Sequence, residues 1–380
     1  MVTTTLRSLR DFYDVFRTGL TSAEIEKLLS DDARGMYSFY VRNMPPRNPA
    51  QSRFIRFLKF SWHLFLAFLL KLTPARRLFY AIALLLVGLA FWDSDLMKAF
   101  YGFLILNFLL ALELADKLVT RDELEFARQI QLSLLPDSLI PVEGFAIASH
   151  SDVAESVGGD YYDLIPMNDG STMVVVGDVS GKGISAALYM VKVQTALQLL
   201  AKEVTDPREL MIRLNEYLYK KLRRNFFLTI TILKVYHDGK ILCCRAGHMP
   251  ALLLDARLRT CSWIQPRGTA IGLAPPAVAD KSKGNGETHT MFEQSLEIEQ
   301  LSMEKGDTLI LYTDGVIESV NRHREEFGEG RLMQVVLDSA GEDVDEVKER
   351  LIKSIASFRN GEELRDDTTF VILKRNGTMT

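Results

Sequence analysis

Four short aspartate-bearing motifs, spread over about two hundred residues, constrain the fold of this chain more than any other feature. They are Val157–Asp163 (VGGDYYD), Gly177–Gly183 (GDVSGKG), Tyr312–Gly315 (YTDG) and Asp366–Thr369 (DDTT). In three of them the aspartate lies at the edge of an apolar run that is typical of a strand. Backbone that bends sharply at strand ends can direct several carboxylates at one point. Two unit charges ~4 Å apart repel by roughly 4 kcal/mol at an effective dielectric of 20, so converging carboxylates predict bound metal ions.

The composition sets the broad class of the chain. The 45 basic and 49 acidic residues among 380 give a formal net charge of -4, and this near balance gives no reason to expect nucleic-acid binding. The three cysteines, Cys243, Cys244 and Cys261, lack the spacing of a zinc site or a disulfide framework. This cysteine usage predicts a reducing, cytoplasmic location for the main domain.

Residues 54–115 are much more apolar than the helical, cytoplasmic region that we expect over residues 1–53. Three apolar stretches follow one another, namely Phe57–Leu72, Leu78–Trp92 and Ala99–Leu112. The last two are shorter than the ~20 residues usual for a membrane span. We predict an interfacial helix at residues 57–72 and two membrane spans at about residues 77–93 and 97–114.

The charges that flank these stretches predict an orientation. Arg76 and Arg77 precede the second stretch, and the loop Asp93–Lys98 follows it. Positive-inside reasoning puts the arginine pair in the cytoplasm and the loop outside. The chain would then be a multi-pass protein of the cytoplasmic (inner) membrane, with its main domain in the cytoplasm. The alternative is a buried helical hairpin of a soluble domain.

Residues 116–136 are expected to form a linker helix with alternating charges, which Pro136 ends. Leu118, Phe126 and Ile130 can share one broad apolar face of this helix. The helix could join two copies of the chain as a dimeric coiled coil, or it could pack on the next domain as a plain amphipathic helix. Both interpretations stay open.

Residues 137–376 change to a mixed pattern of strands and helices. The strand-like runs are Phe145–Ser149, Thr172–Gly177, Phe226–Tyr236, Lys240–Arg245, Ala251–Leu254, Thr308–Tyr312 and Thr369–Lys374. The helical runs are about Ile184–Glu203, Pro207–Leu222, Glu329–Ser339 and Val344–Phe358. Because the helices come in consecutive pairs with strands grouped between them, the order predicts an antiparallel, layered α+β domain rather than a βαβ repeat.

Each aspartate motif alone has an ordinary structural explanation. The segment Gly177–Gly183 is not a phosphate-binding loop, because that pattern needs four residues between its glycines and Ser or Thr after the lysine. A Thr-Asp-Gly triplet is usually a turn. The combination of four motifs is much more specific than any one of them.

The order, spacing and flanks of the four motifs resemble the bacterial protein phosphatase 2C-like (PPM-type) family, in its RsbU/SpoIIE branch. Three further segments carry the resemblance, namely Gln129–Pro136, Arg245–Pro250 and Phe327–Leu332. It covers roughly residues 125–375. The fold that it implies is a layered αββα β-sandwich with the metals at one edge.

The resemblance also implies a set of metal ligands. Asp178 would bridge two Mn²⁺ or Mg²⁺ ions, and the backbone carbonyl of Val179 would complete one of them. Asp314 and Asp366 would hold the other side, and Asp160 would contribute directly or through water. Two such ions activate water for attack on phosphorus, so no nucleophilic Ser or Cys is required.

Four more residues are candidates for supporting roles. Asp163 and Asp367 are further candidates beside the metal ligands, and Asp367 could instead orient its loop. Lys182 stands where many relatives have His, and it could contact substrate phosphate or face solvent. His248 is a candidate proton donor, although a structural role in its turn is the stronger interpretation.

The implied activity is that of a membrane-anchored serine/threonine protein phosphatase. Its substrate would be a phosphorylated STAS-domain anti-anti-sigma factor in a partner-switching pathway. Two alternatives belong to other classes, namely a signalling scaffold with an inactive phosphatase domain and a two-metal nucleotidyl cyclase. The cyclase is disfavoured because the sequence lacks a recognisable purine-selecting hairpin.

Overall fold

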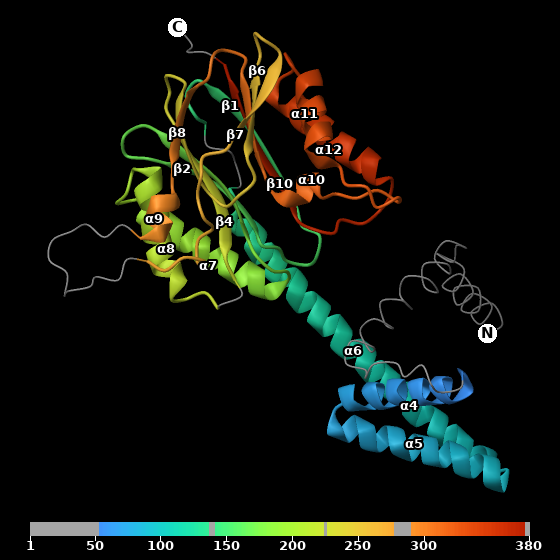
Figure 1. The fold of residues 1–380 in the computed structure, drawn as a ribbon. Coiled ribbons are helices and arrows are strands. Elements are labelled where there is room, and N and C mark those ends of the chain that lie inside the picture. The colour runs from blue at the N-terminus through green and yellow to red at the C-terminus, as the bar shows by residue number, and fades with distance from the viewer. Residues whose placement is uncertain (1–52, 137–140, 224–225, 277–289, 377–380) are drawn as a thin grey trace, which may run out of the picture. The chain divides into compact units, whose positions relative to one another are not determined.

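The computed structural model describes residues 53–136, 141–223, 226–276 and 290–376 (Figure 1). The chain divides into two compact units, Met1–Val119 and Thr120–Thr380. The helical region predicted over residues 1–53 lies outside the described residues, except for its last residue.

The first unit contains three helices, α4 (Arg53–Lys71), α5 (Pro74–Asp93) and the first part of α6 (Leu96–Leu134). Proline in the first turn of α5 suits a helix start, and Ser94 in a left-handed conformation ends it. In the described part of the chain, α5 is the helix whose length and apolar composition suit a membrane span. The second predicted span, at residues 97–114, lies within α6, which continues without a break into the predicted linker helix.

Helices α5 and α6 form a hairpin with an ion pair at each end. The guanidinium of Arg76 lies 2.9 Å from Glu113 Oε2 and 2.7 Å from Asp116 Oδ2. At the other end, Lys98 Nζ lies 2.5 Å from Asp93 Oδ2. The helices touch closely near Gly102. These contacts order the hairpin, while its long apolar flanks remain exposed.

The second unit contains two five-stranded antiparallel sheets. The first sheet has the order β1 (Phe145–Asp152), β10 (Thr368–Arg375), β9 (Thr308–Tyr312), β6 (Ala251–Asp255) and β7 (Thr260–Ile264). The second has the order β2 (Asp160–Pro166), β3 (Thr172–Val179), β4 (Leu228–Val235), β5 (Lys240–Ala246) and β8 (Ile298–Ser302). Alternating residues of both sheets meet in a core between them, which includes Val174 and Val371.

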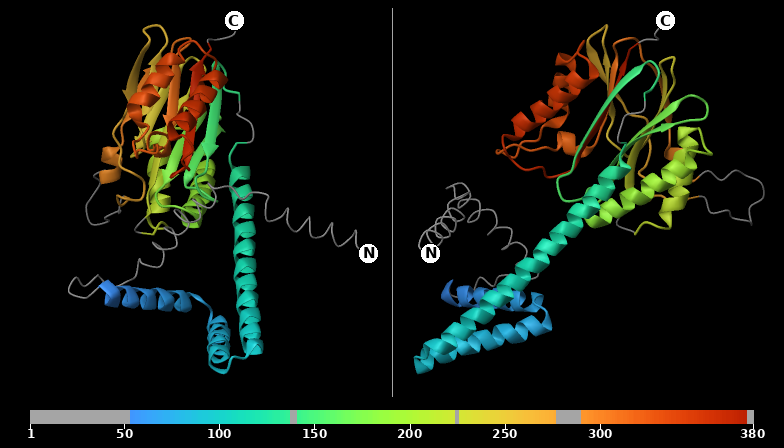
Figure 2. Two further views of the ribbon diagram at one scale, coloured as in Figure 1. Left: turned by 90° about the vertical axis from the view of Figure 1, so that its right-hand side faces the viewer. Right: turned by 180° about the vertical axis from the view of Figure 1, so that it is seen from behind.

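Helices cover the outer face of each sheet (Figure 2). The pair α7 (Ile184–Leu200) and α8 (Pro207–Tyr219) packs on the second sheet, and α11 (Gly328–Asp338) and α12 (Val344–Arg359) pack on the first. Two short helices, α9 (Met291–Ser295) and α10 (Asp314–Ile317), complete the described elements of this unit. The predicted layered αββα sandwich is confirmed.

The strand ends that carry the aspartate motifs meet at one edge of the sandwich. Asp160 at the start of β2 pairs with Asp178 at the end of β3. In the other sheet, the end of β9 adjoins the start of β10, since Tyr312 pairs with Phe370. The hydrogen bond from Thr313, after β9, to Asp160, in β2, shows that these strand ends of the two sheets lie at the same edge.

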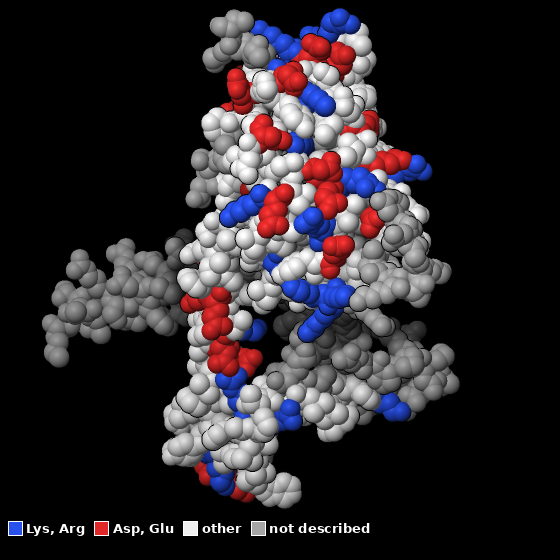
Figure 3. Space-filling model, turned by 90° about the vertical axis from the view of Figure 1, so that its left-hand side faces the viewer, with Lys and Arg blue, Asp and Glu red and all other residues white. Residues whose placement is uncertain are grey.

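The surface of this unit carries mixed charge. Figure 3 shows acidic and basic side chains interspersed on the face to which α8, α9 and β8 belong. Some of them are paired locally, as Arg213 is with Glu209 on α8 and Arg267 with Glu297 before β8. On this face the charges do not gather into a large patch of one sign.

Candidate active site

Asp160 and Asp178 are cross-strand neighbours, and they differ in exposure. Asp160 is buried, with 7% of its surface exposed, and Thr313 Oγ1 donates a hydrogen bond of 2.8 Å to its Oδ2. Asp178 is half-buried at the end of β3. The hydroxyl of Thr313 also receives the backbone N–H of Thr369 at 3.0 Å, so one threonine joins the motifs of three separate strands.

A glycine gives the carboxylate of Asp178 and the carbonyl of Val179 their room. A Cβ at Gly159 would lie 2.6 Å from the carbonyl oxygen of Val179 and 2.9 Å from Asp178 Oδ1. Any side chain there would fill the space beside both oxygens. This close approach gives a physical reason for the glycine before Asp160.

Asp314 and Asp366 come from the other sheet. Asp314 begins α10 directly after β9, and Gly315 lets the backbone of the Asp366–Asp367 turn come close, since a Cβ there would lie 2.0 Å from the Asp367 carbonyl oxygen. Asp366 Oδ1 accepts the N–H of Asp367 at 3.0 Å. Its Oδ2 lies 2.7 Å from Lys182 Nζ.

The carboxylates at this edge act on one another electrostatically. Burial raises the pKa of Asp178 to about 7, together with the negative charges of Asp314 and Asp366. Burial also raises the pKa of Asp314, to which Asp366 adds. The pKa of Asp160 lies well above its usual range because of burial and the charge of Asp178. A divalent cation would relieve this shared cost of burying negative charge.

Asp367 orients the first motif. Its Oδ2 accepts the N–H of Gly159 at 2.8 Å, and its Oδ1 accepts the N–H of Ala154 at 3.0 Å. The side chain is buried, with 8% of its surface exposed. Both carboxylate oxygens are thus used in holding the loop before β2, which is the alternative role that the sequence suggested for this residue.

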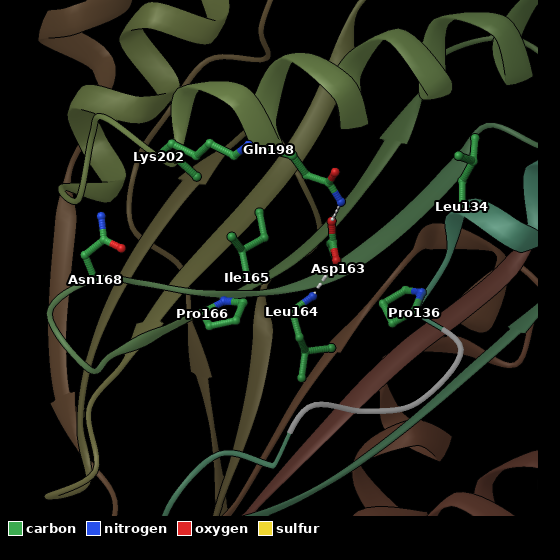
Figure 4. A pocket seen from close by; sticks show the side chains of 10 residues that line it. Leu134, Pro136, Asp163, Leu164, Ile165, Pro166, Asn168, Gln198 and Lys202 are labelled. Carbon is green, nitrogen blue, oxygen red and sulfur yellow. Dashed lines mark hydrogen bonds between the residues drawn. The ribbon is translucent and has the colours of Figure 1, made fainter.

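Asp163 lies away from the other carboxylates. It follows Asp160 by three strand residues, about 10 Å at the usual rise. Figure 4 shows it in the wall of a cavity of about 480 Å³, where Gln198 donates to its Oδ2 at 2.9 Å and the N–H of Leu164 donates to its Oδ1 at 2.8 Å. The structure therefore gives Asp163 a packing environment between β2 and α7, outside the candidate metal site.

His248 is buried behind the edge. Its surface is 3% exposed, its Nδ1 lies 3.0 Å from Thr229 Oγ1, and its carbonyl oxygen accepts a 2.6 Å hydrogen bond from Arg245. Burial and the charge of Arg245 lower the pKa of His248 to about 3. The ring contacts Thr229, which pairs with Asp178, so it supports the strand end that carries Asp178. Because the ring is held neutral, it carries no readily available proton for a leaving group.

Two contributors were not singled out from the sequence. Thr313 belongs to the third motif, and its position next to Asp314 is the only sequence signal for its role. Gln131 was read only as part of the linker segment, yet it is buried and its amide makes two hydrogen bonds with Gly158, at 2.7 Å and 3.1 Å. Nothing in the sequence around Gln131 indicates that its partner lies 27 residues away.

The residues at this edge suit Mn²⁺ or Mg²⁺ in chemistry. They offer carboxylate and carbonyl oxygens, which are the ligands that these hard cations prefer. Among the described residues, no three Asp, Glu, His or Cys side chains are gathered closely enough to enclose a single ion as they stand.

The fold is that of the protein phosphatase 2C class. The SiaA-PP2C domain of Pseudomonas aeruginosa superposes with a TM-score of 0.57 and 20% identity, covering 68% of this chain and 98% of that domain. A family model described as Stage II sporulation protein E (SpoIIE) matches residues 168–376, which is more than half of the chain. The chain belongs to the SpoIIE family.

Two curated proteins are similar to this chain over about the same region. Protein IcfG of Synechocystis sp. is 28% identical over 305 residues, which cover 70% of this chain and 44% of IcfG. Phosphoserine phosphatase RsbU of Bacillus subtilis is 26% identical over 261 residues, which cover 67% of this chain and 70% of RsbU. The chain thus spans less than half the length of one of these relatives.

The close approach at Gly159 can be tested by substitution. We expect Gly159→Ala to abolish metal-dependent phosphate release, because the new methyl group displaces the Val179 carbonyl and the Asp178 carboxylate. Gly330→Ala is the matched control, since a Cβ at Gly330 has open space around it. Phosphate release and circular dichroism of both variants would be measured. Full activity in a folded Gly159→Ala protein would contradict a role for the space beside the Val179 carbonyl and the Asp178 carboxylate.

Proposed function

We propose that this chain is a metal-dependent phosphatase that hydrolyses phosphoserine and phosphothreonine in proteins. The observation that carries the proposal is the convergence of Asp178, Asp314 and Asp366 at one edge of a phosphatase 2C fold. In this proposal these three carboxylates and the Val179 carbonyl hold two Mn²⁺ or Mg²⁺ ions, and Asp160 contributes from its buried position. The bound ions supply acidification of water and neutralisation of the phosphoryl oxygens.

The protein's own residues hold the strand ends and loops that carry the proposed ligands. Thr313, which follows β9, fixes Asp160 at the start of β2, and Asp160 pairs with Asp178 at the end of β3. Asp367 fixes the glycine loop through two backbone N–H groups. The adjacent thiols are not candidates for nucleophilic attack, since Cys243 and Cys244 are fully buried and burial raises the pKa of Cys244 to about 12. In this proposal water attacks the phosphoryl group directly, and no covalent intermediate forms on the protein.

Removal of one carboxylate tests the assignment. We expect Asp314→Asn to lower Mn²⁺-dependent phosphate release by at least about a thousandfold. The amide keeps the shape of the side chain but loses the negative charge that attracts the cation. Asp345→Asn, at an exposed carboxylate on α12, is the control and should keep full activity. Undiminished turnover of a phosphoprotein substrate by Asp314→Asn would contradict the assignment of Asp314 as a metal ligand.

The substrate class that we propose is a phosphorylated STAS-domain protein of a partner-switching pathway. The support is the family membership and the similarity to a phosphoserine phosphatase, RsbU. A scaffold with an inactive domain is the rival account, and the presence of every principal aspartate weighs against it. Failure to release phosphate from any candidate phosphoprotein, with Mn²⁺ bound, would favour the scaffold.

We also propose that the linker helix regulates the site. The last turns of α6 belong to the phosphatase unit, where Gln194 donates to the Leu134 carbonyl oxygen and Gln131 holds both polar backbone groups of Gly158. Gly158 is packed against the carboxylate of Asp367 on its other side, since a Cβ there would lie 2.0 Å from Oδ2. A shift of this helix would therefore be felt directly at the first motif.

Two glutamines of the same helix allow a matched test of this link. We expect Gln131→Ala to raise the Mn²⁺ concentration needed for half-maximal activity by about tenfold or more, because two buried hydrogen bonds to the loop are lost. Gln129→Ala should behave as the wild type, since Gln129 is exposed. Equal metal dependence of the two variants would contradict regulation through Gln131.

Membrane anchoring is a further part of the proposal. It rests on α5, which suits a span by length and composition, and on the exposed aromatic and aliphatic side chains of α6 such as Phe103 and Leu110. The sandwich would then work in the cytoplasm, next to the inner membrane. The homodimer predicted through the linker stays a prediction; Phe126 and Ile130 leave about half or more of their surface exposed there.

Fractionation tests the anchoring. We expect the full-length chain to remain with membranes after alkaline extraction, and a variant with Leu85→Arg and Leu89→Arg in α5 to be released, because arginine near the centre of a span is costly. The control variant Leu258→Arg, an exposed site in the phosphatase unit, should stay in the pellet with the wild type. Release of the wild-type chain by alkali would contradict a spanning helix.

A further inference from the structure

We propose that Lys182 is a built-in counter-ion of the carboxylate edge, which competes with a divalent cation for Asp366 and thereby sets the metal affinity of the site. The inference rests on the proposed function in one respect, because it takes Asp366 to be a metal ligand. It assigns Lys182 a role toward the metal, in addition to the substrate-contacting role considered from the sequence.

The first observation is the pair of bonds that the ammonium makes. Lys182 Nζ lies 2.7 Å from Asp366 Oδ2 and donates a 2.6 Å hydrogen bond to the carbonyl oxygen of Arg365. Because Asp366 Oδ1 already accepts the N–H of Asp367, both oxygens of this carboxylate are engaged. A cation that takes Oδ2 as a ligand must therefore displace the ammonium or share the oxygen with it.

The second observation is the loop on which Lys182 stands. Its neighbours Gly181 and Gly183 have φ values of 103° and 70°, which lie in the left-handed region that glycine adopts easily. Gly183 is also the N-cap of α7, so the lysine is presented directly before a long helix. The side chain of Lys182 is 53% exposed, and its long stem can leave Asp366 without unpacking the core.

The third observation is the charge around the lysine. Lys182 interacts electrostatically with Asp366 and Asp367. It also interacts electrostatically with Asp178 and Asp314. Glu155 and Glu318 also interact electrostatically with Lys182. The ammonium thus neutralises part of an edge that is otherwise acidic.

A resident monovalent charge has two consequences for a divalent cation. It stabilises the carboxylates on their own, and this stabilisation is lost when the ammonium leaves, so the apparent metal affinity falls. Once displaced, the ammonium remains close to the reacting edge, where a strongly hydrated point charge suits a phosphate dianion. Lys182 would then lower the KM for the phosphoprotein more than it changes kcat.

The test uses the full-length protein and measures metal binding apart from activity. Lys182→Met keeps the stem and removes the charge, Lys182→Gln is a second neutral variant, and Lys182→Arg keeps the charge. Lys202→Met is the matched control, because Lys202 is an exposed lysine just beyond the other end of α7. Mn²⁺ binding is followed by titration calorimetry, and the unfolding temperature is measured in EDTA and in saturating Mn²⁺.

We expect Lys182→Met and Lys182→Gln to bind Mn²⁺ about tenfold more tightly than the wild type and to unfold at a lower temperature in EDTA. Lys182→Arg and Lys202→Met should stay within about threefold of the wild-type affinity. Unchanged or weaker Mn²⁺ binding by both neutral variants, with the wild type binding normally, overturns the inference and leaves the proposed function intact. Absence of Mn²⁺ binding in the wild type itself overturns both.

Discussion

The mutual repulsion of carboxylates at one edge of the sandwich is the constraint on which the rest of this structure depends. Asp160 and Asp178 are paired across two strands, and the charges of Asp314 and Asp366 from the other sheet act on Asp178. Such a cluster persists only if the surrounding fold holds it. The two sheets, with a core of buried apolar residues between them, provide that rigidity, and the strand ends determine where the carboxylates lie.

The same edge is held by a small set of polar contacts. Thr313 ties Asp160 to Thr369, and Asp367 ties the glycine loop of the first motif to the start of β10. Gly158 lies between Asp367 on one side and the buried amide of Gln131 on the other. The candidate metal site, the loop that shapes it and the end of the linker helix therefore form one continuous hydrogen-bonded path, which is the physical basis for the proposed regulation.

Much of the sandwich could be predicted from the sequence, because its central strands are long apolar runs. Strands β3, β9 and β10 fall within or next to the predicted runs, and their aspartates follow or precede them directly. Strand β2 was read as a motif and not as a strand, since Asp160 and Asp163 interrupt its apolar pattern. The short strands β7 and β8 are not predicted from the sequence, because each has only five residues and lacks a regular alternation of polar and apolar side chains.

The sequence names candidate site residues, but it cannot show the contacts that they make. Spacing within a motif cannot show that Asp163 faces α7, because that depends on which face of β2 packs on the helix. Nor can local sequence show that Lys182 reaches Asp366, a residue more than 180 positions away. Both facts follow from the register of strands in a folded sandwich, which the pattern of residues specifies only as a whole.

The central claim is that Asp178 holds two metal ions together with Asp314 and Asp366. The most direct measurement is an anomalous difference map from crystals of the protein grown with Mn²⁺. Two peaks about 3.5–4 Å apart, with Asp178 between them, are the result that this account predicts. A map with no peak at this edge, or with one ion bound away from Asp178, would contradict it.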